Sequence, residues 1–547
     1  MRYMNLFLPN MSISLPDIVL ALLWFQTAIF DYFAIVHIWQ LKEYRLDRFM
    51  DFIRSEQGKK FFCSYRFLYR NIFLLLLYAL LKTIPFALTA ISLFFIFGVD
   101  AFINFRQVLK HRIKRPIFTK KAVAIILCIF VLERSLLYVY PSTHIIFLEL
   151  IFRFMTASVI VFLFVIPTTS LKWLSLYRAT KKMSKLQNLM VIGITGSYGK
   201  TSIKEFTAHI VSKKFKVLKT PQNTNTDIGI AEFILKTDFA NIDVFVVEMG
   251  AYKEGEIKKI CDIVHPKIGI LSAINEQHLA LFGSIEQIQK TKYELLRAIP
   301  KDGLVVTNAD NKYCMEYLHE LDCKKIRTFG TDAENKPDCL IKNITVTKQG
   351  IECDGAYKEV EAHLTAPVIG AHQAGNIAAA IIAAVHLKMT KDEIVNAVST
   401  LKNESETALK EYVYGNCTII DDSYNSNPDG FSAALAILNG FPSRFKRIVV
   451  TRGMAELGEK SEELHKKIGE EIAFCADILI VTNPNAVEFF KEAISGLQGK
   501  YKLEIEPIFD EQKLLERVRS LKNTESIILL ESRLPSLVHK EIQGKNT

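Results

Sequence analysis

Gly193-Ile-Thr-Gly-Ser-Tyr-Gly-Lys200-Thr201-Ser202 is the stretch that decides the fold of the second part of this chain. The apolar run Leu189–Ile194 predicts a buried strand before it, and Thr201–Lys213 predicts a helix after it. A glycine-rich turn between a strand and a helix points backbone N–H groups at an anion. The plain phosphate-loop pattern has Gly six residues before the lysine, where this chain has Ile194.

The turn predicts an ATP site. Lys200 adds a point charge for phosphate oxygens, and Thr201 offers the hydroxyl that such loops place on Mg²⁺. The alternative is a chance Gly/Ser turn before a helix, which the strand–turn–helix context disfavours. The residues expected around the nucleotide phosphates are Thr195, Gly196, Ser197, Gly199, Lys200, Thr201 and Ser202.

The composition divides the chain. Its 547 residues are enough for three or four domains, and the net charge of +10 owes much to the first part. The nine cysteines are scattered without a CxxC pair, which favours free thiols in a reducing compartment over a zinc site or a disulfide framework. Nothing at the start resembles a cleavable signal peptide.

The first 187 residues read as a membrane region. Long apolar runs are separated by basic clusters, so we expect membrane lipid, and no nucleic acid, as the partner of this region. Buried globular helices are the alternative, which the number of runs and their basic flanks disfavour. The runs are Ile18–Trp39, Leu68–Phe105, Ala122–Tyr140 and Ile145–Ile166.

The basic clusters predict the topology. Basic loops prefer the cytoplasm, so an even number of crossings is expected between the first two clusters. Leu68–Phe105 is long enough for two short spans with Lys82–Pro85 as the turn, which gives five spans in an inner membrane, with everything after Leu171 in the cytoplasm. Four spans with one long kinked helix is the rival. Glu133 and Arg134 fall inside the fourth predicted span, either lining a polar site or at the interface.

Polar side chains end the predicted strands that follow the loop. Strands alternating with helices predict a parallel, doubly wound α/β sheet with function at the carboxyl ends of its strands. Glu248 follows the strand Val244–Val247, and His278 follows the strand Lys267–Ile274. A carboxylate and an imidazole there can hold Mg²⁺ beside ATP phosphates, although each alone reads equally well as an ordinary polar residue at a strand end.

Together these motifs resemble the Mur ligase superfamily, and most of all its branch that adds D-alanyl-D-alanine to a muramoyl tripeptide. The resemblance runs from about Asn188 to the C-terminus. It is carried by Thr195–Thr201, Thr220–Gly229, Val247–Gly250, Asn275–Leu279, Phe282–Ser284, Asn308–Asp310, Gly370–Asn376, Asp421–Pro428 and Gly453–Gly458.

The resemblance implies an acyl-phosphate mechanism, in which ATP activates a carboxylate and an amine then attacks it. Lys200 would stabilise the transferring phosphoryl group, while Thr201 and Glu248 would hold one Mg²⁺. His278 would hold a second Mg²⁺ with Lys292, which matches a lysine that is carbamylated in this family. Lys290 is a near neighbour that could be confused with it, and a solvated helix lysine is the default reading without the family context.

The resemblance also assigns residues further along the chain. Asn308 resembles the adenine-contacting residue, and His372 and Asn376 match an element near the nucleotide. Asp422 belongs to a segment that resembles the signature orienting the last domain and its amine substrate. The resemblance implies that the catalytic residues are Lys200, His278, Lys292 and Asp422. As bare sequence, that segment is only a polar loop before a helix. Its other polar members are Asp421, Tyr424, Asn425 and Asn427.

The chain departs from the family at three places. Membrane spans stand where the family has a globular uridine-nucleotide domain. Lys410, in Thr407-Ala-Leu-Lys410, stands near a position where the family has an arginine, whose planar fork a lysine lacks. Glu531-Ser-Arg533 replaces a Gly-Ser-Arg motif.

The expected organisation is a transmembrane region over 1–187, a central ATP-binding domain of phosphate-loop type over 188–402 and a smaller Rossmann-like α/β domain over 403–547. The expected activity is a membrane-anchored, ATP- and Mg²⁺-dependent amide ligase joining a nucleotide- or lipid-linked cell-envelope precursor to an amino acid or dipeptide. The alternatives are another ligase of the superfamily, glutamate-adding or polymerising, and an ATP-binding membrane scaffold or transport-coupled ATPase with degenerate ligase chemistry.

Overall fold

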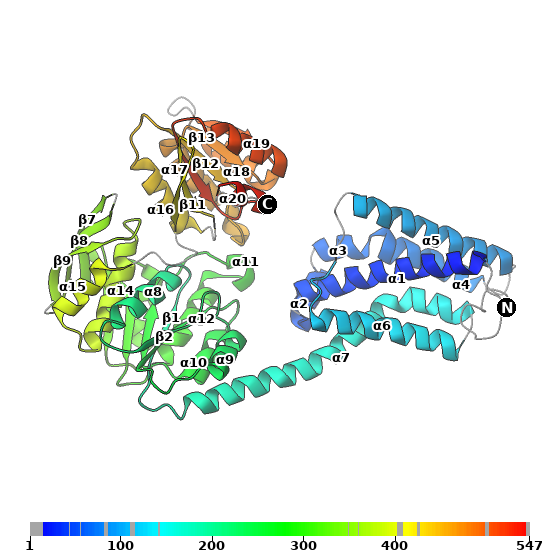
Figure 1. Cartoon of the computed structure of the whole chain (residues 1–547), viewed down its shortest axis with the longest axis horizontal. Helices are drawn as coiled ribbons and strands as arrows, with labels where there is room; N and C mark the ends of the chain where they lie inside the picture. The colour runs from blue at the N-terminus through cyan, green and yellow to red at the C-terminus, as the bar shows by residue number, and fades with distance from the viewer. Residues whose placement is uncertain are drawn as a thin grey trace. The chain divides into compact units, whose positions relative to one another are not determined.

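The computed structural model describes residues 15–42, 44–54, 56–80, 86–109, 115–140, 143–347, 349–358, 360–401, 409–423, 427–497 and 503–542. The chain forms two compact units, Met1–Leu174 and Ser175–Thr547, whose elements are labelled in Figure 1. The first unit is helical, and the second carries two β-sheets with helices packed on them.

The helical unit follows the apolar runs of the sequence. The run Leu68–Phe105 gives two helices, α4 and α5, and the expected turn Lys82–Pro85 lies within the stretch 81–85, outside the described residues. A π-helical turn over Tyr65–Tyr69 leads directly into α4. The helices are α1 (Leu15–Leu41), α2 (Leu46–Arg54), α3 (Glu56–Phe62), α4 (Arg70–Ala79), α5 (Phe86–Leu109), α6 (Lys120–Val139) and α7 (Thr143–Met183).

Three of the described helical stretches are long and apolar enough to cross a membrane: Ile18–Leu41, Ile91–Leu109 and Ile145–Met183. The five-span topology stays a prediction, and α4 is only 10 residues long. The last helix is much longer than the expected span over 145–166, because α7 continues past Pro167 to Met183. Its final turns pack in the core of the second unit through Ala179 and Met183.

The central sheet of the second unit has nine strands in the order β2-β3-β1-β4-β5-β6-β7-β8-β9. Strands β1 to β6 are parallel, as expected, and β1 pairs with both β3 and β4. The chain therefore reverses its direction of winding beside β1, which is where doubly wound sheets bind ligands. The strands are β1 (Met190–Thr195), β2 (Val217–Lys219), β3 (Val244–Glu248), β4 (Ile268–Leu271), β5 (Leu304–Asn308), β6 (Ile326–Gly330), β7 (Cys339–Thr347), β8 (Gly350–Tyr357) and β9 (Val360–Ala366).

The expectation of an all-parallel sheet is wrong at one edge. β7, β8 and β9 pair antiparallel with one another, although β7 itself runs parallel to β6. Only two residues separate β7 from β8 and β8 from β9. Connections this short join antiparallel strands, since a parallel pair needs a crossover of a dozen or more residues.

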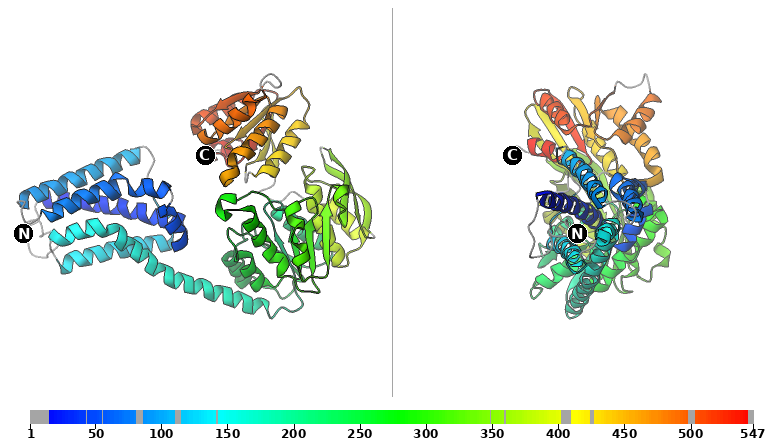
Figure 2. Two further views of the ribbon diagram at one scale, coloured as in Figure 1. Left: turned by 180° about the vertical axis from the view of Figure 1, so that it is seen from behind. Right: turned by 90° about the vertical axis from the view of Figure 1, so that its right-hand side faces the viewer.

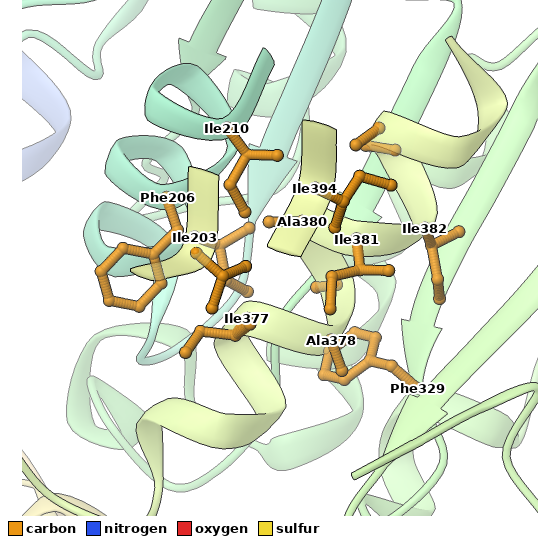
Figure 3. Packing of buried hydrophobic residues seen from close by; sticks show 14 of the residues in the cluster. Ile203, Phe206, Ile210, Phe329, Ile377, Ala378, Ala380, Ile381, Ile382 and Ile394 are labelled. Atoms are coloured by element: carbon orange, nitrogen blue, oxygen red, sulfur yellow. The ribbon is translucent and has the colours of Figure 1, made fainter. Parts of the chain in front are cut away.

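Helices cover both faces of the central sheet. Successive side chains of a strand point to opposite faces, so Ile192 and Ile194 join one core while Val191 joins the other. The first core packs α8 against α14 and α15, and Figure 3 shows its isoleucines and Phe206 between these helices. The helices are α8 (Lys200–Val211), α9 (Asp227–Lys236), α10 (Glu256–Val264), α11 (Leu279–Phe282), α12 (Ile285–Arg297), α13 (Lys312–Met315), α14 (Gln373–His386) and α15 (Lys391–Ser399).

The C-terminal part, from β10 onward, is a second α/β domain with a six-stranded sheet in the order β10-β11-β15-β12-β13-β14. It is parallel except for β10, which pairs antiparallel with β11. Figure 2 shows it from two sides in yellow to red. Its elements are β10 (Lys410–Tyr414), β11 (Cys417–Asp422), α16 (Pro428–Asn439), β12 (Lys446–Thr451), α17 (Ser461–Cys475), β13 (Ile478–Val481), α18 (Pro484–Ser495), β14 (Glu504–Pro507), α19 (Glu511–Leu521), β15 (Ser526–Glu531) and α20 (Ser536–Ile542).

Candidate active site

A turn between β1 and α8 forms the predicted anion cradle. Gly196 has φ +148°, and a Cβ there would lie 2.0 Å from Ser272 Oγ and 2.9 Å from the Ala273 carbonyl oxygen. Gly199 has φ +78°, and a Cβ there would lie 2.9 Å from Asn376 Oδ1. Only glycine fits such close approaches at these angles, so the backbone of the turn lies bare at the start of α8.

The side chain of Lys200 folds back onto the glycine turn. Lys200 Nζ donates to the carbonyl oxygens of Gly196, at 2.7 Å, and Ser197, at 2.8 Å. Thr195 anchors the strand end by donating to the Met249 carbonyl oxygen at 2.9 Å. The ammonium group is therefore held by carbonyl groups of the turn, and its expected contact with nucleotide phosphates stays a prediction.

Glu248 lies beside the turn because of strand register. β1 and β3 are parallel neighbours, with Ile194 opposite Glu248. Thr201 Oγ1 donates to Glu248 Oε2 at 3.1 Å, and Asn225 Nδ2 donates to Glu248 Oε1 at 3.2 Å. Glu248 is 5% exposed. The predicted hydroxyl and carboxylate ligands of one Mg²⁺ thus lie in direct contact.

Lys204 also faces Glu248, and the sequence analysis missed it. It lies one turn after Lys200 in α8, and its Nζ is 3.3 Å from Glu248 Oε2. Its side chain is completely buried. Its position in the first turns of a helix next to the loop is the only sequence signal that could have drawn attention to it.

Lys292 and Lys290 differ in environment. Lys292 is buried in α12, whereas Lys290 is exposed on the same helix. Burial lowers the pKa of Lys292 to about 7, and nearby Lys200 acts in the same direction. An amine with a pKa near 7 is partly uncharged at neutral pH, and only the uncharged amine reacts with CO₂. Burial therefore favours Lys292 over Lys290 for the expected carbamate.

His278 ends the loop after β4, just before α11, with a left-handed backbone at φ 66°. Its Nδ1 pairs with a carboxylate oxygen of Glu456, from the motif Gly453–Gly458 of the C-terminal domain. Burial lowers the pKa of His278, while this bond to Glu456 opposes the shift. Lys200 and Lys292 also interact electrostatically with His278, so the three predicted side chains face one region.

A metal site is only partly formed by these side chains. Within the described part of the chain, no three His, Cys, Asp or Glu side chains gather closely enough to hold a metal ion. The expected ligands include a hydroxyl and a modified lysine, so the set Thr201, Glu248, His278 and Lys292 fits Mg²⁺ by chemistry, since Mg²⁺ prefers few protein ligands together with phosphate oxygens.

The predicted nucleotide residues reach the loop unequally. Asn376 Oδ1 lies against Gly199, and its amide donates to Gln373 Oε1 at 2.9 Å. Asn308 ends β5 and accepts from the Asp310 N–H at 2.9 Å, while His372 contacts Gln373. Among the described residues, no hydrogen bond joins Asn308 or His372 to the loop 196–199.

Asp422 ends β11 beside Asp421. Burial raises the pKa of Asp422 to about 7, and the charge of Asp421 adds to the shift. Asp421 accepts from the Ser423 hydroxyl at 2.5 Å and faces His539 Nδ1 at 3.6 Å. Tyr424 and Asn425, expected in the same segment, lie outside the described residues.

Contacts between the two sheets' loops were not anticipated. Asn275 Nδ2 donates to Asn427 Oδ1 at 3.1 Å and to Asp429 Oδ2 at 2.7 Å. Lys460 Nζ donates to Glu276 Oε1 at 3.1 Å. Both partners of the central domain come from the loop that carries His278, so this loop is where the two α/β domains meet.

Two family models match the second unit. Residues 194–384 match the Mur ligase middle domain, and residues 407–533 match the Mur ligase, glutamate ligase domain. A UDP-N-acetylmuramoyl-tripeptide–D-alanyl-D-alanine ligase of Haemophilus influenzae is 30% identical over 317 residues, 56% of this chain and 67% of the relative. The chain belongs to the Mur ligase family.

Other relatives of this Mur ligase carry the same enzyme name. The enzyme of Escherichia coli K12 is 32% identical over 280 residues, 51% of this chain and 61% of the relative, and the enzyme of Bacillus subtilis is 28% identical over 283 residues. This chain therefore spans about 60% of the length of several curated relatives it matches, with 61% and 60% for these two.

Solved structures share the fold. A MurF ligase from Thermotoga maritima in complex with ADP is 25% identical, with a TM-score of 0.59, covering 69% of this chain and 85% of the other. A MurF from Acinetobacter baumannii is 23% identical, with a TM-score of 0.59, covering 68% and 79%. The phosphate-loop α/β domain and the C-terminal α/β domain predicted from the sequence are thus those of the Mur ligase fold.

Proposed function

We propose that this Mur ligase is an ATP- and Mg²⁺-dependent amide ligase of peptidoglycan precursors that joins D-alanyl-D-alanine to a muramoyl tripeptide. The contact of Thr201 with Glu248 beside the glycine turn carries the proposal, because it sets a hydroxyl and a carboxylate at the place where a nucleotide phosphate would lie. The activity named for the relatives supports the choice of substrates.

The first half-reaction would activate a carboxylate. An oxygen of the acceptor carboxylate attacks the γ-phosphorus of ATP, the bond to ADP breaks, and an acyl phosphate forms. Lys200 and the backbone N–H groups of the turn would stabilise the charge on the phosphoryl oxygens. Thr201 and Glu248 would hold Mg²⁺, which would supply positive charge to neutralise the phosphate oxygens.

The second half-reaction would form the amide. The neutral amine attacks the carbonyl carbon, phosphate leaves with the former carboxylate oxygen, and the nitrogen loses a proton. Asp422, with a pKa raised to about 7, is suited to accept that proton near neutral pH. The His278–Glu456 contact would hold the two domains together over the acyl phosphate and exclude water.

We further propose that the helical unit lies in the inner membrane, with the α/β domains in the cytoplasm. Apolar side chains point outward along its helices, for example Phe95 at 68%, Ile91 at 62% and Leu163 at 56% exposure. Surfaces of this kind are covered by lipid or by protein. A lipid-linked acceptor would then be presented at the membrane face.

Detergent-purified protein tests the ligase. Phosphate release is measured with ATP, Mg²⁺ and D-alanyl-D-alanine, with either UDP-muramoyl tripeptide or its lipid-linked counterpart as the acceptor. Release that requires both substrates, together with the mass of the amide product, is expected, and Lys200→Ala serves as the blank. Equal phosphate release without an acceptor would contradict the ligase proposal. A preference for the soluble acceptor would contradict the proposal that the acceptor is lipid-linked.

A further inference from the structure

A buried network of charges links the apolar helices of the helical unit. Its members are widely separated in sequence, and each is at most 7% exposed. Charged side chains inside apolar helices are rare, face the bundle interior and mark ion or proton sites. They are Asp31 of α1, Arg70 of α4, Asp100 of α5, Glu133 of α6, and Glu149 and Arg153 of α7.

Arg70 binds two acids. Its Nη2 lies 2.9 Å from Asp31 Oδ2, and its Nη1 lies 3.0 Å from Asp100 Oδ2. The guanidinium group therefore ties α4 to α1 and α5, and both carboxylates lie against one buried cation.

Arg153 binds the third acid and shares the first. Its Nε and Nη2 each lie 3.1 Å from an oxygen of Glu133, and its Nη1 lies 3.3 Å from Asp31 Oδ2. The Tyr32 hydroxyl donates to Glu133 Oε2 at 2.5 Å. The network is thus continuous from α5 to α7, and three acids are satisfied by two arginines and a tyrosine.

Glu149 stands apart from this network in its bonding. Glu149 is only 7% exposed, and both of its carboxyl oxygens are buried without a hydrogen-bond partner. It lies one turn before Arg153 on α7, so both side chains project from the same face of the helix. Its electrostatic interactions are with Glu133 and Arg134 of α6 and with Arg153.

Among the described residues of the network and the neighbouring Arg134, the charges leave one negative charge over. Asp31, Asp100, Glu133 and Glu149 carry four negative charges, and Arg70, Arg153 and the half-buried Arg134 carry three positive ones. A buried, unpaired carboxylate is costly, and it is relieved by a cation or by protonation. No metal-binding group of three acidic, His or Cys side chains occurs among the described residues.

We propose that Glu149 is a proton-binding site in the helical unit, held within the network of Arg70 and Arg153. One proton from water binds a Glu149 carboxyl oxygen and leaves by the same route, and no other bond changes. The network keeps the remaining acids charged and paired, so the exchangeable proton is confined to Glu149. This site gives the helical unit a proton-dependent role that is independent of the ligase reaction.

Infrared spectroscopy of the full-length protein in vesicles of phosphatidylethanolamine and phosphatidylglycerol tests the proposal. We expect a carbonyl band of a protonated carboxylic acid at neutral pH that is lost at alkaline pH. The band should vanish in Glu149→Gln, an isosteric change, and shift in Glu149→Asp. It should persist in Glu361→Gln, which removes an exposed acid of β9.

Two results would overturn the proposal. The first is a spectrum in which no carboxylic acid band changes in Glu149→Gln or Glu149→Asp, at any pH at which the protein stays folded. Glu149 would then not bind a proton. Loss of the band on adding Na⁺ at constant pH would assign the site to an alkali cation. ATP-dependent ligation is measured on the same samples, so failure of this proposal and failure of the ligase proposal are separable.

Discussion

Lys292 shows how far single residues could be predicted. The resemblance selected Lys292, but the sequence could not exclude Lys290 two residues earlier, since both lie on a helix with many polar residues. The fold separates them, because the buried residues of α12 include Lys292 and not Lys290. Tertiary burial, which no local pattern encodes, lowers the pKa of one lysine only.

The first prediction concerns a carbamate on Lys292. Because the pKa is lowered to about 7, the amine is increasingly neutral as pH rises through 7, and carbamate forms only from the neutral amine. Protein incubated with ¹³C-bicarbonate should give a carbamate signal by NMR that falls as pH drops below 7. Lys292→Ala should lose this signal and reduce ligation about 100-fold.

Lys290→Ala is the matched control, because it removes an exposed lysine of the same helix. It should keep both the signal and the activity. Equal signals in Lys292→Ala and the unaltered protein would show that the modified lysine lies elsewhere.

The second prediction concerns the glycine turn. Gly196→Ala places a Cβ 2.0 Å from Ser272 Oγ at a backbone angle that disfavours side chains, so it should lower the free energy of unfolding by about 2 kcal/mol and abolish stabilisation by ADP. Gly255→Ala is the control, since Gly255 also has a positive φ, +85°, but no atom lies within 4 Å of the added Cβ. Thermal unfolding with and without ADP measures both. An ADP-induced shift in Gly196→Ala equal to that of the control would contradict the cradle.

Charged residues of the helical unit were predicted less well. The sequence drew attention to Glu133 with its neighbour Arg134, but Glu133 pairs with Arg153 of the next helix. Periodicity within one helix cannot reveal which side chain of another helix faces it. Asp31, Arg70 and Asp100 gain their meaning only when the helices are assembled.

At the scale of elements, apolar runs and glycine turns were good guides. β1 and β3 lie within one residue of the expected strands Leu189–Ile194 and Val244–Val247, whereas β4 ends three residues before the end of the expected strand Lys267–Ile274. The edge strands β7 to β9 were missed because half-exposed antiparallel strands lack a continuous apolar run. The residues that connect these strands, Lys348-Gln349 and Lys358-Glu359, are not among the Gly-, Asn- or Asp-containing pairs that typically mark two-residue hairpin turns.

The third prediction tests the proposed membrane location of the helical unit with native thiols. Cys63 and Cys128 are exposed, whereas the other seven cysteines are buried. Cys128 lies in the middle of α6, beside the exposed Leu127 and Val131, so lipid should cover it. A charged maleimide added to inside-out membrane vesicles should label Cys63 and leave Cys128 unlabelled, as read by peptide mass spectrometry.

The same protein denatured in dodecyl sulfate serves as the control, and both cysteines should then be labelled. Equal labelling of Cys63 and Cys128 in intact vesicles would place α6 in water and contradict the membrane assignment of that helix.

On the scale of the whole molecule, the two α/β domains meet through residues that are distant in sequence. His278 and Glu456 are 178 residues apart, and Asn275 and Asp429 are 154 apart. The motifs that contain Asn275, His278 and Glu456 were recognised, and Asp429 directly follows the motif Asp421–Pro428. A single sequence does not tell which of these motifs touch. The assembled fold supplies that pairing and gives Glu456 a role.

The fourth prediction follows from this contact. Glu456→Ala removes the acceptor that holds His278, so kcat for ligation should fall about 10-fold while ATP binding is retained. Glu459→Ala, an exposed acid one turn later, should have no effect on kcat. Steady-state kinetics, with nucleotide binding measured by calorimetry, separates the two steps. A matching loss in both variants would show that the effect is one of surface charge.

The most direct test of the account follows oxygen through the reaction. The acceptor carboxylate is labelled with ¹⁸O, and the phosphate released by detergent-purified protein is analysed by mass spectrometry. An acyl-phosphate ligase transfers one carboxylate oxygen to phosphate for each amide formed, and this is the result that we expect, with none from Lys200→Ala. Phosphate released without ¹⁸O would mean that water attacks ATP, and the chain would then be an ATPase rather than a ligase.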